Sequence, residues 1–249
     1  MLERPSPEVR GPAWTLAAAI LLVTAVGIAP SATCGESRQA ILDRIQRECL
    51  NAYPPELLAK MASGAREVPD EVEADPEAQM QFLDKEIPLD KGLFYPVLLE
   101  DMLPAFERYV SSGDRFLDLG SGDGRVVFMA SVLGADAVGI EYDKQMVKIS
   151  RRAGKALRDL IEPRRARIVR GDFFASPWSG YDVIFFFDLS SFEPERVRQK
   201  VQAEMDPGAV LIVGFEQSPF PGLEVVEQDR PSHPTIKVYR QPAEKPATE

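Results

Sequence analysis

A short apolar segment followed by three closely spaced glycines constrains the fold of this chain more than any other feature. Residues 116–119 (FLDL) are typical of a buried strand, and glycines follow at positions 120, 122 and 124. An apolar helical pattern then begins at Val126. Glycine permits left-handed backbone angles and close approach to a ligand, and the first amides of a helix have no partner within it. The order strand, glycine turn, helix predicts a nucleotide-type site in an open α/β sheet.

The glycine spacing distinguishes between two kinds of nucleotide site. Dinucleotide-binding proteins favour G-x-G-x-x-G after the strand, whereas this chain has G-x-G-x-G, with Asp118 inside the end of the strand. A carboxylate there would repel a pyrophosphate, but it would suit a ligand that carries an amino group and a sulfonium. An NAD-dependent enzyme is therefore disfavoured.

At residues 118–125 (DLGSGDGR) the chain resembles the class I S-adenosylmethionine-dependent methyltransferases. The motif is close to that of a lysine-methyltransferase branch, which includes the histone-lysine enzymes without a SET domain and the mitochondrial membrane-protein lysine methyltransferases. The resemblance covers roughly residues 93–239 and is much more specific for the cofactor than for the substrate. It implies S-adenosyl-L-methionine as cofactor, bound by Asp118, Gly120, Ser121, Gly122, Asp123 and Gly124.

Residues after two further strands extend the predicted cofactor site. Glu141 ends the strand expected at 137–141, where it can accept hydrogen bonds from both ribose hydroxyls, and Tyr142 can lie against the adenine. The resemblance implies that Asp172, after the strand at 166–170, accepts the adenine amino group. It also implies that Phe173 packs on the adenine ring.

The candidate catalytic residues are Asp188 and Tyr95. Asp188 follows an apolar segment, residues 181–187 (YDVIFFF), which predicts a central parallel strand. Methyltransferases place substrate groups at the end of this strand, and the resemblance implies that Tyr95, beside Phe94, closes over the methionine end of the cofactor. Either side chain could help to remove a proton from a lysine substrate. The chain lacks N-P-P-Y after residue 187, which disfavours methylation of DNA adenine or glutamine.

The remaining pattern completes the predicted fold class: α/β, with a Rossmann-like, mostly parallel sheet and a terminal antiparallel hairpin. Further strands are expected at 209–214, 223–227 and 235–239, and helices at 97–109, 143–161 and 193–205. We expect a methyltransferase domain at residues 91–240 and a disordered tail at 241–249. Residues 36–90 are expected to form a helical extension, with helices at 37–53, 56–63 and 77–85, and an acidic linker at 66–76.

Residues 1–35 are predicted to be a signal peptide or a membrane anchor. Residues 14–29 are almost wholly apolar, and Arg4 and Arg10 precede them. The apolar run is short for a transmembrane helix and long for the core of a signal peptide. An anchor with its N-terminus in the cytoplasm would send the remaining chain outward, whereas S-adenosylmethionine is cytoplasmic. The side of the membrane therefore stays open.

Charge is distributed unevenly along the chain. The net charge is −10, which disfavours general nucleic-acid binding. Residues 67–90 contain nine acids and one base, whereas residues 144–170 contain ten bases. Five of these bases share one face of the helix expected at 143–161: Lys148, Arg151, Arg152, Lys155 and Arg158. A solvated face is favoured, with anionic lipid, an acidic partner or the chain's own acidic linker as the alternatives.

No metal site is expected, because the chain has two cysteines, Cys34 and Cys49, one histidine and no C-x-x-C pair. Three functions follow from the sequence. The first is a membrane-anchored methyltransferase whose favoured substrate, protein lysine, is implied by the resemblance alone. The second is a methyltransferase for a small molecule or lipid, marked by a closed apolar pocket beside Asp188. The third is a non-catalytic binding module that does not bind the cofactor.

Overall fold

The computed structural model describes residues 36–58, 97–162, 164–187, 194–214, 220–228 and 236–243. The predicted signal or anchor, the acidic linker, and the last residues of the predicted tail lie outside these ranges. Within them, no helix is both long and apolar enough to span a bilayer. The role of residues 1–35 stays a prediction.

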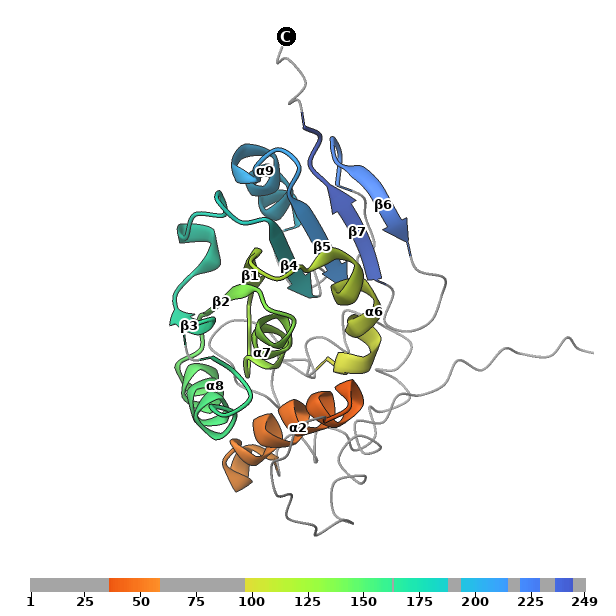
Figure 1. The fold of residues 1–249 in the computed structure, drawn as a ribbon. Helices are drawn as coiled ribbons and strands as arrows, with labels where there is room; N and C mark the ends of the chain where they lie inside the picture. Colours follow the sequence, from red (N-terminus) through yellow and green to blue (C-terminus); the bar gives the residue numbers. More distant parts are fainter. Residues whose placement is uncertain are drawn as a thin grey trace, which may run out of the picture.

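A seven-stranded sheet forms the centre of the fold, in the order β3-β2-β1-β4-β5-β7-β6 (Figure 1). The first five strands run parallel to their neighbours, and β7 runs antiparallel to both β5 and β6. This confirms the predicted mostly parallel α/β sheet with a terminal antiparallel hairpin. The strands are β1 (Arg115–Leu119), β2 (Asp136–Glu141), β3 (Ala166–Arg170), β4 (Val183–Phe187), β5 (Val210–Gly214), β6 (Glu224–Gln228) and β7 (Ile236–Arg240).

The chain changes direction between β1 and β4. From β1 it proceeds outward through β2 to β3, and then it returns to β4 on the other side of β1. Ligands in open α/β sheets bind beyond the carboxyl ends of the strands at such a switch point. The fold therefore places the glycine-rich segment after β1 at the position where a ligand is expected.

The helices are α2 (Arg38–Asn51), α6 (Leu99–Tyr109), α7 (Arg125–Val132), α8 (Lys144–Ala156) and α9 (Pro194–Glu204), with a 3-10 turn η1 (Phe173–Ala175). Asp143 caps α8, as predicted, because its carboxylate accepts hydrogen bonds from the amides of Gln145 and Met146 at 2.6 and 2.8 Å. The helix ends at Ala156 instead of near residue 161. Leu157 leaves the helical region of backbone angles, and the chain continues in hydrogen-bonded turns.

Two apolar cores cover the two faces of the sheet. Phe116 belongs to one core and its neighbour Leu117 to the other, as the alternation of side chains along a strand requires. The first core includes buried residues of α2, α6, α7 and α8, and the second includes those of α9 together with Trp178. Figure 1 shows α7 and α8 on the lower side of the sheet, with α2 farther out below them, and α9 on the opposite side.

The extension helix α2 packs directly on the sheet-covering helices. Its apolar face is buried at Leu42, Ile45 and Cys49, and it contacts α6, α7 and α8. Gln46 accepts a hydrogen bond from the amide of Leu99 at 3.2 Å, which supplies a cap for the start of α6. The part of residues 36–90 that the structure describes therefore packs on the helices that cover the sheet, through buried contacts.

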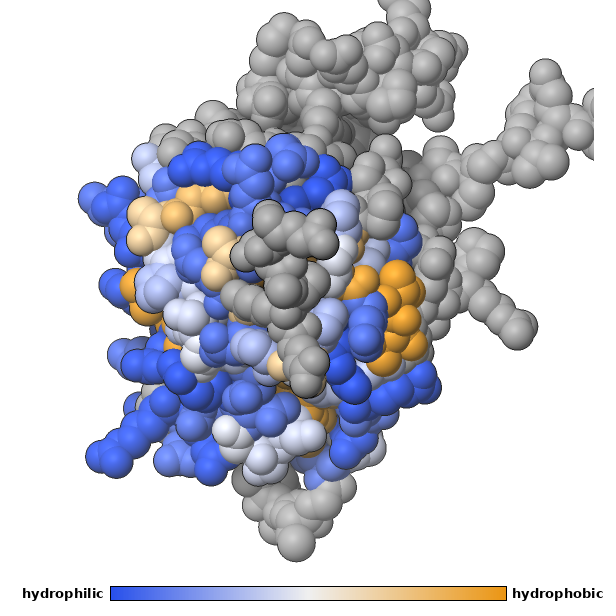
Figure 2. Space-filling view, turned by 90° about the horizontal axis from the view of Figure 1, so that it is seen from above, coloured by the Kyte–Doolittle hydropathy of each residue, from blue (hydrophilic) through white to orange (hydrophobic). Residues whose placement is uncertain are grey.

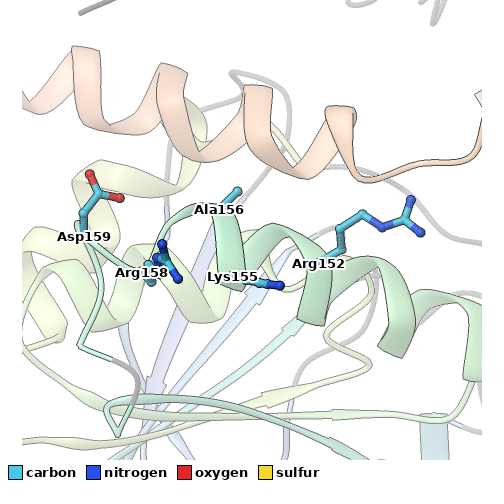
Figure 3. Close-up of a pocket in the computed structure, with 5 residues that line it drawn as sticks. All are labelled: Arg152, Lys155, Ala156, Arg158 and Asp159. Carbon is cyan, nitrogen blue, oxygen red and sulfur yellow. The ribbon is translucent and has the colours of Figure 1, made fainter. Parts of the chain in front are cut away.

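All five bases of the predicted stripe are exposed, but only four lie on α8, because Arg158 follows the end of the helix at Ala156. Arg152 donates a hydrogen bond to the carbonyl oxygen of Ala52 at 3.1 Å, and Arg44 of α2 pairs with Asp159 at 2.7 Å. A shallow groove of about 560 Å³ lies between this hydrogen bond and this ion pair (Figure 3). It is lined by Arg152, Lys155, Ala156, Arg158 and Asp159. Arg152 of the stripe therefore helps to hold the end of α2. Figure 2 shows the molecule from above the view of Figure 1. This face is largely hydrophilic and carries small, separate hydrophobic patches.

Replacement of Phe106 by alanine should destabilise the fold strongly. Phe106 is fully buried on α6, and its ring lies 5.4 Å from that of Phe116 and 5.5 Å from that of Phe185. We expect Phe106→Ala to lower the free energy of unfolding by about 3–5 kcal/mol, measured by urea denaturation. Val225→Ala, at an exposed position on β6, is the control and should change it by less than about 0.5 kcal/mol. Equal effects of the two substitutions on the free energy of unfolding would contradict the burial of Phe106 in the core.

Candidate functional site

The glycine loop between β1 and α7 has the conformation that its sequence predicts. Gly120, Gly122 and Gly124 all have positive φ, at 77°, 53° and 85°. At Gly120 an added Cβ would meet no atom within 4 Å, so the space beside this residue is open. At Gly124 an added Cβ would lie 3.0 Å from the ring of Phe128. The loop therefore leaves room for a ligand at its first glycine and packs tightly against α7 at its last.

Hydrogen bonds and packing tie the loop to β2. The amides of Gly120 and Ser121 both donate to the carbonyl oxygen of Ile140, at 2.9 and 3.0 Å. The side chain of Ser121 lies against Gly139, where an added Cβ would come within 2.5 Å of it. Its hydroxyl is buried and has no hydrogen-bond partner among the described residues. The Ser121 side chain thus faces the sheet.

Two carboxyl groups lie at the carboxyl ends of neighbouring strands. Asp118 is 2% exposed on β1, and Glu141 is the last residue of β2. Burial raises the pKa of Asp118 well above its usual range, and the charges of Glu141 and Asp123 raise it further. Burial also raises the pKa of Glu141, although backbone hydrogen bonds act in the opposite direction. A positively charged group bound between these two acids would favour their ionised forms, because an opposite charge lowers the pKa of a carboxyl group.

The carboxylate of Glu141 holds the glycine loop through hydrogen bonds and can still accept a hydrogen bond from a ligand. Its Oε2 accepts a hydrogen bond from the amide of Gly122 at 2.8 Å, and its Oε1 accepts one from Asp143 at 2.7 Å. The backbone of Tyr142 contributes a third hydrogen bond to this carboxylate. A carboxylate offers about four acceptor sites, so capacity remains for a ligand hydroxyl group. This set of acceptors is compatible with S-adenosylmethionine, and the assignment of Glu141 to the ribose and of Asp118 to the amino group stays a prediction.

The residues predicted at the adenine end occupy three different environments. Tyr142 is 37% exposed beside Glu141. Asp172 caps η1 by accepting a hydrogen bond from Phe174 at 2.9 Å, and Gly171 donates to the Glu141 carbonyl oxygen at 2.9 Å. Phe173 is 7% exposed and packs against Phe174, Trp178 and Phe186. The structure therefore brings Tyr142 and Asp172 to the end of β2 and β3, with most of Phe173 in the core.

Both predicted catalytic residues, Tyr95 and Asp188, lie outside the described residues. The strand that precedes Asp188 is β4, which pairs in parallel with β1 in the register Leu119 with Phe186. The carboxyl end of β4 is thus beside the start of the glycine loop. The roles of Tyr95 and Asp188 stay predictions.

A buried ion pair beneath the loop was not anticipated from the sequence. Asp123, predicted to bind cofactor, is fully buried, and its carboxylate accepts hydrogen bonds from Arg125 at 2.6 and 3.0 Å. Arg125 also donates to the carbonyl oxygen of Val97 at 3.0 Å, and the Tyr53 hydroxyl donates to Asp123 at 3.1 Å. The Asp123 side chain is therefore directed into the protein. Tyr53 carries no sequence signal for this role, because 70 residues separate it from its partner.

Comparison with known proteins gives three related findings. The profile of the ANTKMT methyltransferase domain matches residues 118–220. The chain is 30% identical over 137 residues to a protein-lysine N-methyltransferase of Saccharolobus islandicus (strain REY15A), a match that spans 52% of this chain and 81% of the relative. It also resembles an RNA methyltransferase from Salinibacter ruber in complex with S-adenosyl-L-homocysteine, with TM-score 0.51 and 27% identity over 63% of this chain and 98% of that one.

Asp118→Asn should stabilise the ligand-free protein increasingly as the pH rises. The folded-state pKa of Asp118 is raised, so the stability that its protonated form contributes is present in acid and is lost as the pH rises through that pKa. Asparagine does not ionise and avoids this loss. Urea denaturation at about pH 5 and about pH 8 should show a difference between variant and parent that grows with pH. The exposed Asp136→Asn is the control, and a difference for Asp118→Asn that shrinks with pH would contradict the assignment.

Glu141→Ala should weaken binding of S-adenosylmethionine by about 1–3 kcal/mol, because hydrogen bonds to a charged group are lost. Calorimetric titration measures this change. The matched control is Glu195→Ala, at an exposed position on α9, which should leave the affinity unaltered. An unchanged affinity in Glu141→Ala would reject the ribose assignment.

Proposed function

Because the chain belongs to the class I S-adenosylmethionine-dependent methyltransferases, we propose that it transfers the methyl group to a lysine side chain of a protein. The observation that carries this proposal is the 30% identity to the protein-lysine N-methyltransferase of S. islandicus, over 81% of that relative. The match to the ANTKMT methyltransferase domain supports it. Because the chain belongs to this enzyme class, we set aside the alternative function considered from the sequence, a non-catalytic binding module.

The cofactor would be held by the residues at the ends of β1 and β2. Asp118 would take the methionine amino group and Glu141 the ribose hydroxyls, and the open space beside Gly120 admits the ligand. When bound, the cofactor supplies an electrophilic methyl group on a sulfonium. The protein mainly has to align the acceptor with that methyl group and exclude water.

A lysine acceptor must lose a proton before it can attack. We assign this task to Asp188 and Tyr95, which remain proposals based on the sequence. The position of β4 supports Asp188, because the strand ends beside β1 and the chain leaves it at the edge that carries Asp118 and Glu141. Attachment of the enzyme to a membrane by residues 1–35 is part of the same proposal and rests on their apolar composition.

The acceptor class is testable with the full chain and radiolabelled S-adenosylmethionine. A cell extract would be labelled with its protein amines either free or blocked by propionylation, and protein, RNA and lipid fractions would then be separated. We expect label in the protein fraction, loss of that label after blocking, and methyllysine on hydrolysis. Label in the RNA fraction, or in lipids or small molecules, would overturn the lysine proposal.

Asp188→Asn should lower kcat by about a hundredfold or more, the usual contribution of a proton acceptor, while the affinity for S-adenosylmethionine changes little. Steady-state kinetics with a labelled protein substrate and calorimetric titration measure the two quantities. The control is Asp136→Asn, an exposed acid at the opposite end of β2. Unchanged kcat in Asp188→Asn would remove this residue from the mechanism.

A further inference from the structure

The N-terminal extension, residues 36–58, reaches the glycine loop through its buried residues near the end of α2. The Tyr53 hydroxyl donates a hydrogen bond to Oδ2 of Asp123 at 3.1 Å, and Cys49 Sγ lies 3.8 Å from the carbonyl oxygen of the same residue. Tyr53 is 4% exposed and Cys49 is fully buried. The extension therefore contacts both the side chain and the backbone of one loop residue.

Asp123 depends on these contacts because it carries a buried charge. Arg125 supplies hydrogen bonds to both carboxylate oxygens, and Tyr53 supplies a further one to Oδ2. Burial, together with the charge of Asp123, raises the pKa of Tyr53 well above its usual range, so its hydroxyl stays a donor. Loss of this donor would leave a buried carboxylate with less than its full set of partners, which is costly.

The same loop residue borders the cofactor side of the loop. Gly122, which precedes Asp123, donates its amide to Glu141 at 2.8 Å, and Glu141 is the predicted ribose ligand. Both Gly122 and Gly124 have positive φ, and glycine by itself holds no single backbone conformation, so the position of this part of the loop depends on the contacts of Asp123. Without those contacts, the amide of Gly122 and its hydrogen bond to Glu141 would be less firmly positioned.

We propose that the N-terminal extension is part of the cofactor-binding machinery, and that Tyr53 is a positioning residue that fixes the glycine loop for S-adenosylmethionine. Tyr53 acts through Asp123 and Gly122 instead of through a contact with the cofactor. Tyr53 therefore strengthens the binding of the cofactor and lowers the KM for the cofactor. This inference holds whatever the methyl acceptor is.

Tyr53→Phe in the full chain tests the proposal, because it removes the hydroxyl and keeps the ring. We expect about tenfold weaker binding of S-adenosylmethionine by calorimetric titration, equivalent to about 1.4 kcal/mol, with a matching rise in the KM for the cofactor. The kcat at saturating cofactor should stay within about twofold. Hydrogen exchange of the amides of residues 120–124 should be faster in the ligand-free variant.

Leu42→Ala is the matched control for a purely structural effect. Leu42 is buried on α2, the helix that precedes Tyr53, and belongs to the apolar core, so its truncation lowers the stability of the extension without removing the Tyr53–Asp123 hydrogen bond. At a temperature where both variants are folded, we expect Leu42→Ala to keep the parent cofactor affinity and loop exchange. Three results would overturn the proposal: parental affinity in Tyr53→Phe, equal weakening in Leu42→Ala, or a fall in kcat without a change in KM.

Discussion

The buried pair of Asp123 and Arg125 is the interaction on which the arrangement of the site depends. Removing two opposite charges from water is expensive, and their attraction compensates only when geometry and additional hydrogen bonds are complete. Here the additional partners come from distant parts of the chain: the Tyr53 hydroxyl from the extension and the Val97 carbonyl oxygen from the segment before α6. The pair therefore requires that the extension, the start of α6 and the glycine loop be in place together.

The local patterns of the sequence were sufficient for most of the fold. Apolar runs ending in Asp118 and Glu141 predicted β1 and β2, and the glycine spacing predicted the turn that follows β1. These features depend on neighbouring residues, so they can be recognised without the tertiary structure. The mostly parallel sheet with its terminal hairpin followed from the alternation of strands and helices and from the resemblance to a known class.

Other parts of the site depend on contacts between residues far apart in sequence and could not be predicted. Asp123 looked like a ligand of the cofactor because it lies among the glycines, yet its partners are Arg125 and Tyr53. Ser121 is directed against Gly139 because β2 has no side chain at that position. No local pattern indicates either orientation. The raised pKa of Asp118 likewise arises from its burial in the folded chain, to which the charges of Glu141 and Asp123 add.

Because α2 packs on α8, the two helices can reach their final positions only after both have been synthesised. Arg152 holds the carbonyl oxygen of Ala52, although 100 residues separate them. A ribosome adds roughly 5–20 residues per second, so the partner of α2 emerges about 5–20 s after α2 itself. During that interval α2 lacks α8, one of the three helices that it contacts, whereas α6 and α7 are synthesised earlier. Among the described helices, α2 is the first to be synthesised, and it must wait for α8 before it reaches its final position.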